Sequence, residues 1–345
     1  MNSAKVAVVI LNWNGRALLE QFLPSVLQTT YENADIYVAD NASTDDSVAF
    51  VRAQYPTVQL IEMQENWGFA EGYNVALKQV EADYYVLLNS DVEVTPNWIE
   101  PIIAEMEQDD GIGAAQPKIL AQRQKTHFEY AGAAGGFIDA LGYSFCRGRI
   151  FEEIEEDTGQ YDTPLPICWA SGCSLFIRAK LYHDLGGLDK DFFAHFEEID
   201  LCWRTWRAGY QVMVFPASTI YHVGGATLSA ANPQKTYLNF RNNLVFLLKN
   251  KSLPSFFLLY VVRGILDDMA AVRFLVGGQG KYAWAVVKAH FHFWTNLPLW
   301  LKNRKASNKL IDSVRRKDSE VQPPIYGGSV VWGHYVGGKK GYGDL

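Results

Sequence analysis

The chain has 345 residues, 48% of them hydrophobic, which is enough for a large catalytic domain with an appendage. Its formal net charge is −7, from 31 basic and 38 acidic residues, and this balance disfavours a general nucleic-acid binder. No apolar run approaches the roughly 20 residues that a membrane-spanning helix needs. The chain opens directly on a strand pattern without a signal peptide, so we expect a cytoplasmic protein.

Apolar runs rich in β-branched residues alternate with segments of helical periodicity over the first 110 residues. The pattern predicts strands at residues 5–11, 34–39, 58–62 and 84–88. It predicts helices at residues 16–28, 43–54, 71–82 and 96–109. Such a repeat demands an α/β fold with a mostly parallel central sheet and helices on both faces.

The pattern loosens over residues 111–163, which we interpret as strands joined by a mobile excursion. Regular structure is then predicted in chain order as a strand at 168–178, a helix at 197–208, strands at 211–215 and 216–223, and helices from 235–249 onward. After Pro323 the glycine-rich tail is expected to be irregular.

Four cysteines are present, and none shows the Cys-x-x-Cys spacing of a zinc site. Reduced thiols are expected, with a disulfide between Cys168 and Cys173 as the alternative.

Two isolated aspartates follow predicted strands, where open α/β sheets bind their ligands. Asp91 ends the segment Asn89-Ser90-Asp91, and a divalent cation could take its carboxylate together with a diphosphate. Asp40 could accept the imide N–H of a pyrimidine base. The alternatives are that Asp91 caps the next segment and that Asp40 forms a turn.

A third acidic cluster holds Glu197, Glu198 and Asp200 within four residues. Mutual repulsion tends to raise the proton affinity of at least one carboxylate, so Glu198 is a candidate general base. The alternative is an acidic first turn of a surface helix. His222 could complete a metal shell or be a structural histidine. The sequence contains no Gly-x-Ser-x-Gly elbow and no Walker phosphate loop.

Taken in order, these segments resemble the family 2 inverting glycosyltransferases of the GT-A fold, in the rhamnosyltransferase-like branch. The likeness covers roughly residues 5 to 250. It is carried by Val-Val-Ile-Leu-Asn-Trp-Asn-Gly, Val-Ala-Asp-Asn-Ala-Ser-Thr-Asp-Asp-Ser, Asn-Trp-Gly-Phe-Ala-Glu-Gly-Tyr-Asn, Leu-Leu-Asn-Ser-Asp-Val-Glu, Ser-Gly-Cys-Ser-Leu-Phe-Ile-Arg, Phe-Glu-Glu-Ile-Asp-Leu-Cys-Trp-Arg and Ile-Tyr-His-Val-Gly-Gly.

The resemblance implies a role for each matching residue. Asp91 and His222 would bind a divalent cation, Mn²⁺ or Mg²⁺, and Glu198 would be the catalytic base. The nucleotide-sugar would be bound by Asn12, Asn14, Asp40, Asn41, Ser43, Asn66, Gly68, Phe69, Asn74, Asn89 and Ser90. Donor sugar and acceptor would meet at Trp169, Ser171 and Gly172.

Two positions depart from the family pattern. Asn89 replaces the first aspartate of Asp-x-Asp, and Glu198 replaces the usual aspartate of the base motif. The longer side chain leaves Glu197 and Asp200 as competitors for the role of base.

The resemblance implies a GT-A catalytic domain at residues 1–230, with a nucleotide-sugar half at about 1–110 and an acceptor half at about 111–230. Residues 231–345 would form a mostly helical C-terminal extension. Aromatic residues interleaved with Lys and Arg in this extension suit either packing on the catalytic domain, peripheral contact with the inner face of a membrane, or a homodimer contact.

We therefore expect a metal-dependent inverting transferase that moves a sugar from a UDP- or dTDP-sugar, such as dTDP-rhamnose, to a saccharide or lipid-linked acceptor. The product would belong to a cell-surface polysaccharide, and no nucleic-acid partner is expected. The rival hypotheses are a sugar nucleotidyltransferase and a catalytically inactive carbohydrate-binding protein.

Overall fold

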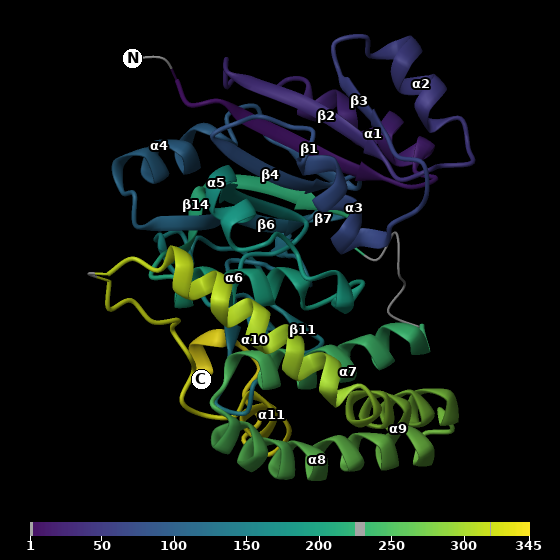
Figure 1. Ribbon diagram of the computed structural model, residues 1–345, viewed down its shortest axis with the longest axis vertical. Helices are drawn as coiled ribbons and strands as arrows, with labels where there is room; N and C mark the ends of the chain where they lie inside the picture. The colour runs from purple at the N-terminus through teal and green to yellow at the C-terminus, as the bar shows by residue number, and fades with distance from the viewer. Residues whose placement is uncertain (1–2, 225–231, 318) are drawn as a thin grey trace.

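The computed structural model describes residues 3–224, 232–317 and 319–345. The chain folds into a sheet-based region and a helical region stacked along the long axis of the molecule (Figure 1). The predicted boundary at residues 230–231 falls outside the described residues, so the division into two domains stays a prediction.

Within the described residues, the central sheet has ten strands, eight of them in the order β12-β14-β6-β13-β4-β1-β2-β3, with β5 paired to β14 and β7 to β6. Their bounds are β1 Val6–Asn12, β2 Ala34–Asp40, β3 Gln59–Glu62, β4 Tyr84–Asn89, β5 Val92–Val94, β6 Ile112–Ala121, β7 Gln124–Phe128, β12 Leu165–Pro166, β13 Ser174–Arg178 and β14 Gln211–His222. The four strands from β4 to β3 are parallel, and β13 runs antiparallel between β4 and β6. The prediction of a mostly parallel α/β sheet is confirmed.

Alternation along the strands divides the core between the two faces of the sheet. Val6, Val8 and Ile10 of β1 pack into one cluster with α1, α2 and α4, while Ala7 and Val9 face the opposite cluster with α3, α5 and α6. The bounds of these helices are α1 Arg16–Val26, α2 Ser47–Gln54, α3 Gly68–Leu77, α4 Glu100–Gln108, α5 Ala179–Asp184 and α6 Glu197–Arg207. Burial on both faces explains why the strands are almost continuously apolar.

Most predicted elements differ from the observed ones by a few residues at their ends, and three of these differences have a visible cause. The helix predicted at 71–82 is α3 and begins earlier, because the Asn66 side chain accepts the Gly68 N–H at its start. Strand β13 begins only at Ser174, because the N–H groups of Cys168 and Trp169 bond instead to the Gly136 carbonyl. The two strands predicted at 211–223 are one strand, β14, with a register shift between Phe215 and Thr219.

The segment predicted to be a mobile excursion contains a second sheet, of strand order β11-β10-β9-β8. Its strands are β8 Gly136–Ile138, β9 Ser144–Cys146, β10 Arg149–Ile150 and β11 Glu153–Ile154. The tail predicted to be irregular packs on this sheet, since Tyr326 donates its N–H to the Ile138 carbonyl and the centre of the Tyr342 ring lies 5.2 Å from that of Phe137. It also contains helix α11, Val330–Tyr335, and two short 3-10 helices occur at η1 Lys190–Phe192 and η2 Tyr342–Asp344.

Four long helices form the helical region below the sheet in Figure 1. They are α7 Pro233–Asn250, α8 Leu253–Val276, α9 Gly280–Thr295 and α10 Leu297–Val314. Helix α7 packs on α9 and α10, and α10 also packs on α6. None of the helices in the described part of the chain combines the length and hydropathy that crossing a membrane requires.

All four cysteines are buried free thiols. The alternative of a Cys168–Cys173 disulfide is therefore wrong. Burial raises the pKa of both thiols, to about 12 for Cys168 and about 11 for Cys173, which keeps them protonated and unreactive near neutral pH.

A buried ion-pair network ties the helical region to the sheet region. Lys249 of α7 lies 2.9 Å from Asp200 of α6 and 2.5 Å from Asp189, and Arg204 approaches the same Asp200 carboxylate at 2.8 Å. Lys249 is 2% exposed and Asp200 is fully buried, so neither charge can turn to water.

Replacing Lys249 by Ala should destabilise the protein by about 3–5 kcal/mol, because it leaves two carboxylates short of a buried cation. Urea unfolding measures the change. Lys180→Ala removes an exposed ion pair with Asp184 and should change the free energy of unfolding by less than about 1 kcal/mol. Equal losses in the two variants would contradict this account.

Candidate active site

The carboxyl ends of the parallel strands bring the first group of predicted residues together. The strand register sets Asn12 opposite Asp40 and Leu11 opposite Asn89. Asn12 donates to Asp40 at 2.9 Å, and the Ser43 N–H donates to the other Asp40 oxygen at 2.9 Å. Asp40 is buried, and these two bonds occupy only part of its accepting capacity.

Asn12 and Ser90 both adjoin Gly15. A Cβ at Gly15 would collide with Asn12 Oδ1 and lie 3.8 Å from Ser90 Oγ. Asn12 Oδ1 is buried with no hydrogen-bond partner among the described residues. Asn14 has a positive φ of 51° and accepts the Thr44 N–H at 2.7 Å, so it fixes the turn after Asp40.

The segment around Gly68 is held in place by Asn41. The Asn41 amide donates to Asn66 Oδ1 and to the Gly68 carbonyl at 3.0 and 2.9 Å, and accepts the Trp67 N–H at 2.9 Å. Gly68 has a φ of +73°, and a Cβ there would lie 3.0 Å from the Phe193 ring. Glycine is therefore required where this segment meets the loop before α6.

Asn74 lies apart from the ligand-facing groups. Its amide donates to Glu71 and to the Leu188 carbonyl, and its Oδ1 accepts from Tyr182 and the Leu188 N–H. All its hydrogen-bonding capacity is used inside the protein, so its place is structural, against the turn after α5.

Asp91 and His222 are in direct contact, as their predicted shared role requires. His222 Nε2 lies 3.1 Å from Asp91 Oδ1, and both side chains are buried. Burial lowers the pKa of His222, but the carboxylates of Asp91 and Glu129 outweigh it, and the pKa lies well above its usual value.

Glu129 was not predicted from the sequence. Its Oε1 lies 3.4 Å from His222 Nδ1, and its Oε2 accepts the Ala131 N–H. It follows β7 with no motif around it, so only its place in the fold brings it to the site.

The Asp91–His222 pair fits a divalent cation. Two neighbouring ligands in an octahedral shell lie about 3 Å apart, which is the spacing of this pair. A carboxylate against the second ring nitrogen, as Glu129 provides, is typical of metal-binding histidines. Among the described residues, no group of three or more His, Cys, Asp or Glu side chains is placed to hold a metal ion, so the candidate site rests on this pair.

The acidic cluster at the start of α6 divides into three environments. Asp200 accepts from Arg204, Lys249 and Asn250; burial works against its charge, but Lys249 and Arg204 lower its pKa. Glu197 is buried, and burial followed by the charge of Glu198 raises its pKa well above the usual value. Glu198 is half-buried, and burial raises its pKa to about 7.

Both glutamates have an oxygen without a partner. Glu197 Oε2 and Glu198 Oε2 are buried and make no hydrogen bond to any described residue. An unpaired buried carboxylate oxygen costs free energy unless a ligand or a proton satisfies it. Of the two, only Glu198 is partly accessible to a substrate.

The loop that delivers Glu198 has a strained backbone. Phe193, His195 and Phe196 have positive φ values of 68°, 67° and 76°. Each such residue costs about 1 kcal/mol or more, and such conformations persist only where surrounding contacts fix them. Here Asn242 of α7 donates to the carbonyls of Phe192, Ala194 and His195, at 3.0, 2.9 and 2.6 Å.

The predicted meeting point of donor and acceptor is partly open. A Cβ at Gly172 would lie 3.7 Å from Glu198 Cβ and 3.8 Å from the Phe69 ring, so these three residues adjoin. Ser171 bonds to Gln116 and to the Ala131 carbonyl and is buried. Trp169 is buried against Gly136, with its indole N–H on the Phe137 carbonyl, and therefore presents no open face to an acceptor.

The segment around Gly172 connects the carboxylate groups. Gly172 adjoins Glu198 and lies between Ser171 and Cys173 in the chain. The Ser171 hydroxyl donates to the Ala131 carbonyl, and the Ala131 N–H donates to Glu129. The Cys173 carbonyl accepts the Asn89 N–H, two residues before Asp91. The metal pair, Glu129 and the candidate base therefore lie at the same end of the sheet.

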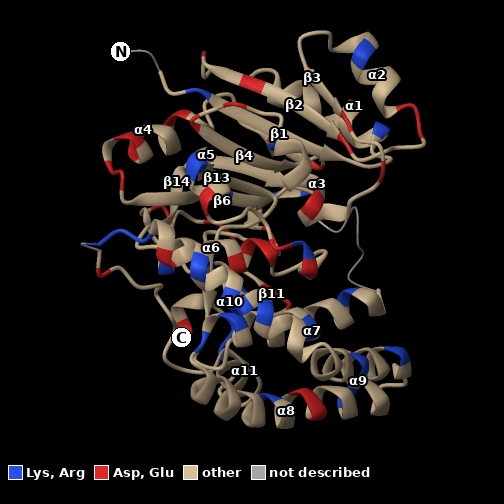
Figure 2. Ribbon diagram, in the orientation of Figure 1, with Lys and Arg blue, Asp and Glu red and all other residues tan. Residues whose placement is uncertain are grey.

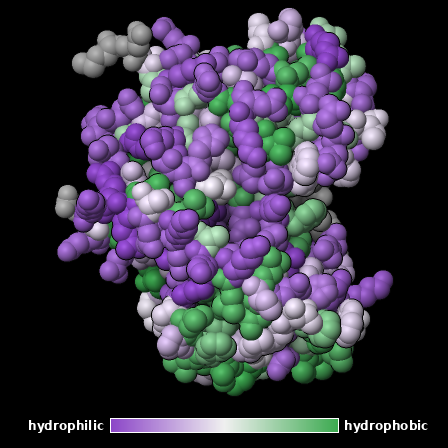
Figure 3. All heavy atoms as spheres, in the orientation of Figure 1, coloured by the Kyte–Doolittle hydropathy of each residue, from purple (hydrophilic) through white to green (hydrophobic). Residues whose placement is uncertain are grey.

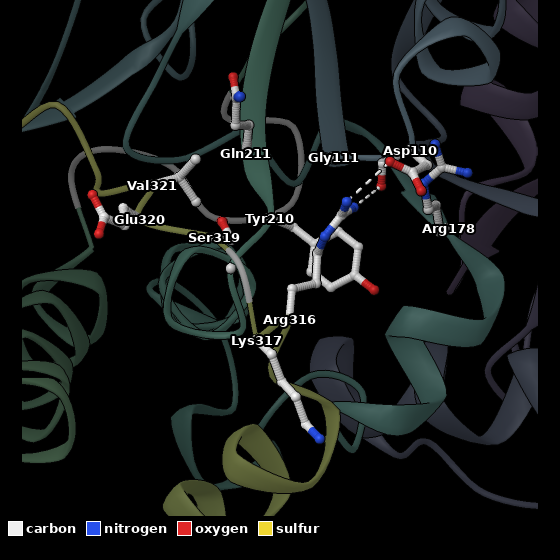
Figure 4. A pocket seen from close by; sticks show the side chains of 11 residues that line it. Asp110, Gly111, Arg178, Tyr210, Gln211, Arg316, Lys317, Ser319, Glu320 and Val321 are labelled. Carbon is white, nitrogen blue, oxygen red and sulfur yellow. Dashed lines mark hydrogen bonds and ion pairs between the residues drawn. The ribbon is translucent and has the colours of Figure 1, made fainter.

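The hollow drawn in Figure 4 lies elsewhere. It has a volume of about 740 Å³ and is lined by Asp110, Gly111, Tyr210, Gln211 and Arg316, among others. Gly111 and Gln211 lie at the starts of β6 and β14, whereas Asp40 and Asn89 end β2 and β4 and Asp91 follows β4. A second hollow, of about 590 Å³, lies on α8. Neither hollow is lined by a candidate residue.

The chain belongs to the glycosyl transferase family 2, whose domain profile matches residues 7–183. The resemblance found in the sequence is thereby confirmed. An N-acetylglucosaminyl-diphospho-decaprenol L-rhamnosyltransferase of Mycobacterium tuberculosis is 25% identical over 233 residues, covering 62% of this chain and 75% of the relative. A poly-beta-1,6-N-acetyl-D-glucosamine synthase of Staphylococcus aureus is 22% identical over 265 residues, covering 74% of this chain and 60% of the relative.

Solved structures share the GT-A fold. The crystal structure of GalNAc-T7 with UDP, GalNAc and Mn²⁺ has a TM-score of 0.55 at 15% identity, covering 71% of this chain and 48% of that one. The mannosyltransferase PcManGT of Pyrobaculum calidifontis, in complex with GDP-Man and Mn²⁺, has a TM-score of 0.51 at 16% identity, covering 91% and 86%. The protein is thus a glycosyltransferase with a GT-A catalytic fold and a helical C-terminal region.

Replacing Asn242 by Ala should lower kcat for glycosyl transfer by about 10²-fold, because the loop that positions Glu198 loses its donor to three carbonyls. Steady-state kinetics measures the change. Asn243→Ala is the matched control: it removes an adjacent buried amide that bonds to the Gly142 carbonyl instead. A control variant that loses kcat equally would show that general destabilisation, not loop position, causes the effect.

Proposed function

We propose that the protein is a metal-dependent, inverting glycosyltransferase that uses a UDP- or dTDP-sugar, such as dTDP-rhamnose. The acceptor would be a hydroxyl of a saccharide or lipid-linked saccharide in cell-surface polysaccharide synthesis. The observation that carries the proposal is Glu198: a half-buried carboxylate with an unpartnered oxygen and a pKa of about 7, beside Gly172 and Phe69. The L-rhamnosyltransferase and polysaccharide synthase relatives support the donor and product classes.

The nucleotide would lie across the strand ends. Asp40 has accepting capacity left for the imide N–H of uracil or thymine, and Asn12 Oδ1 is an unpaired acceptor next to it. Trp13 and Trp67 are 52% and 42% exposed and adjoin Asn12 and Asn66 in the chain. Exposed indoles at this edge would offer a stacking surface for the base.

Asp91 and His222 would hold the divalent cation, with Glu129 fixing the imidazole through its second nitrogen. When bound, the cation supplies positive charge to the diphosphate leaving group. The protein itself contributes these three side chains and the buried setting in which their charges act strongly.

Glu198 would act as the general base. Its oxygen takes the proton of the acceptor hydroxyl while that oxygen bonds to the anomeric carbon. The bond from the anomeric carbon to the diphosphate breaks on the opposite face, and the diphosphate leaves with the electron pair, so the configuration inverts. Glu197 is too buried to meet an acceptor, and the oxygens of Asp200 are held by Arg204, Lys249 and Asn250.

We place the reaction on the cytoplasmic side of a membrane. A donor nucleotide-sugar is a cytoplasmic metabolite, and the relative from Mycobacterium tuberculosis bears the name of an enzyme that acts on a decaprenol-linked sugar.

Glu198→Gln should lower kcat by about 10²–10⁴-fold, because an amide cannot take the proton. Binding of UDP or dTDP, measured by calorimetry, should persist. Glu197→Gln is the matched control and should retain far more activity than Glu198→Gln. Normal turnover by Glu198→Gln would remove the base assignment.

The pH profile of kcat/KM should rise to a plateau with a midpoint near pH 7. A base works only when ionised, and burial raises the pKa of Glu198 to about 7, so activity falls about tenfold per pH unit below that value. Donor binding measured over the same range separates loss of the base from loss of affinity. A midpoint below pH 5 would mean that an unshifted carboxylate limits the reaction.

Removal of divalent cations by a chelator should suppress transfer, and Mn²⁺ or Mg²⁺ should restore it. Mn²⁺ should also increase the thermal stabilisation by UDP or dTDP, and Asp91→Asn should abolish that increase, because one of two protein ligands is weakened. The exposed Asp312, paired with Arg315, gives the control Asp312→Asn. Full activity in chelator would exclude Asp91 and His222 from a metal role.

A further inference from the structure

Helix α8 has an unusual distribution of charged and apolar side chains. Besides Phe256, it buries two charged residues, Arg263 and Asp267, which are 2% and 1% exposed and lie 3.4 Å apart. Asp267 also lies 3.1 Å from His290 of α9, and Arg263 stacks on the Tyr143 ring at 3.6 Å. A helix that merely covered a globular protein would turn its charges to water and its apolar side inward.

The outward side of α8 is apolar. Its exposed aliphatic residues recur at spacings of three and four, as one helical stripe, which we call the α8 stripe: Leu258, Val262, Ile265, Met269, Val272 and Val276. Five of the six are at least 60% exposed. A shallow groove of about 590 Å³ runs along its C-terminal half, where Asp268 and Arg273 supply the charged side chains.

Neighbouring helices extend this surface with aromatic residues. Trp284, Phe291 and Trp294 of α9 are 65%, 64% and 41% exposed, and Trp332 and Tyr335 of α11 are 67% and 54% exposed. Helix α9 packs along α8, and Arg273 of α8 lies 5.2 Å from the Tyr335 ring. Figure 3 shows apolar side chains gathered at the lower end of the molecule, where Figure 1 places α8 and α11. Contiguous apolar surface of this kind marks an interaction site.

Charge is segregated between the two regions of the chain. Residues 233–317 contain 15 Lys and Arg against three Asp and no Glu, a net charge of +12, whereas residues 1–232 contain 14 Lys and Arg against 32 Asp and Glu, a net charge of −18. In Figure 2, Lys and Arg lie along α7, α9 and α10. The apolar surface therefore belongs to the positive part of a negative protein.

We propose that the α8 stripe, with the aromatic residues of α9 and α11 beside it, docks on an anionic lipid bilayer and lies in its interface. An anionic surface complements the charge of +12, whereas a second copy of the chain would bring two such regions together. Exposed Trp and Tyr beside an aliphatic stripe suit the headgroup layer of a bilayer, because their rings can contact the acyl chains while their N–H and O–H groups remain hydrated. Since no described helix can span a membrane, the contact is peripheral. The inference extends the proposed function, because a lipid-linked acceptor would lie in the same surface.

The test is sedimentation of the full chain with vesicles of phosphatidylglycerol and phosphatidylethanolamine, or of phosphatidylcholine alone. We expect binding to the anionic vesicles that weakens as salt is raised. Ile265→Glu should lower the vesicle-bound partition about tenfold or more, the factor that corresponds to losing the burial of one such side chain. Ile154→Glu, at an isoleucine of β11 that is 43% exposed, is the matched control and should bind as the wild type does. Arg273→Gln should weaken binding to the anionic vesicles only.

Three outcomes would overturn the proposal. The first is that the wild type does not bind anionic vesicles, and the second is that Ile265→Glu and Ile154→Glu lose binding equally. The third is that vesicle binding is absent while light scattering shows a dimer that Ile265→Glu dissociates. The last would assign the surface to a second copy. Two further measurements separate this proposal from the proposed function. Glu198→Gln should still bind vesicles, and Ile265→Glu should still transfer sugar to a water-soluble acceptor.

Discussion

The position of the candidate base depends on the contacts between α7 and the start of α6. Three carbonyls of the loop before Glu197 accept from the single amide of Asn242, and Lys249, two turns further along α7, binds the buried Asp200. The loop itself has three residues in the left-handed region, which it would not adopt without these bonds. The helical region is therefore part of the catalytic structure, since it fixes the direction in which Glu198 enters the site.

Neighbouring carboxylates acquire different properties because their partners differ. Asp200 has two cations and an amide, which keep it charged; Glu198 and Glu197 have buried oxygens without partners, which favours the protonated form. Asp40 and Asp91 also differ in their partners: Asp40 accepts from Asn12 and the Ser43 N–H, whereas Asp91 contacts His222. One short acidic motif thus yields a structural ion pair at Asp200 and a candidate base at Glu198, two residues apart in the same helical turn.

The segregation of charge gives the helical region a second use. Its inner side carries the polar residues that fix the sheet region, and its outer side exposes the α8 stripe. An anionic bilayer would attract the positive helical region and repel the negative sheet region. Both effects favour the orientation in which the α8 stripe faces the bilayer and the sheet region faces away from it. The fold would then orient the enzyme as well as attach it.

The sequence alone determined the α/β repeat, the strand ends that carry Asp40 and Asp91, and the family, because hydrophobic periodicity and ordered motifs are local features. It did not reveal the second sheet, whose strands are only two or three residues long, or the packing of the tail on that sheet, which joins segments far apart in the chain. Nor could it find Glu129, which has no local motif and reaches His222 only through the fold. The tertiary structure alone decided that Asn74, Trp169 and Asp200 are engaged inside the protein, because hydrogen-bond partners and burial are set by residues far away in the chain.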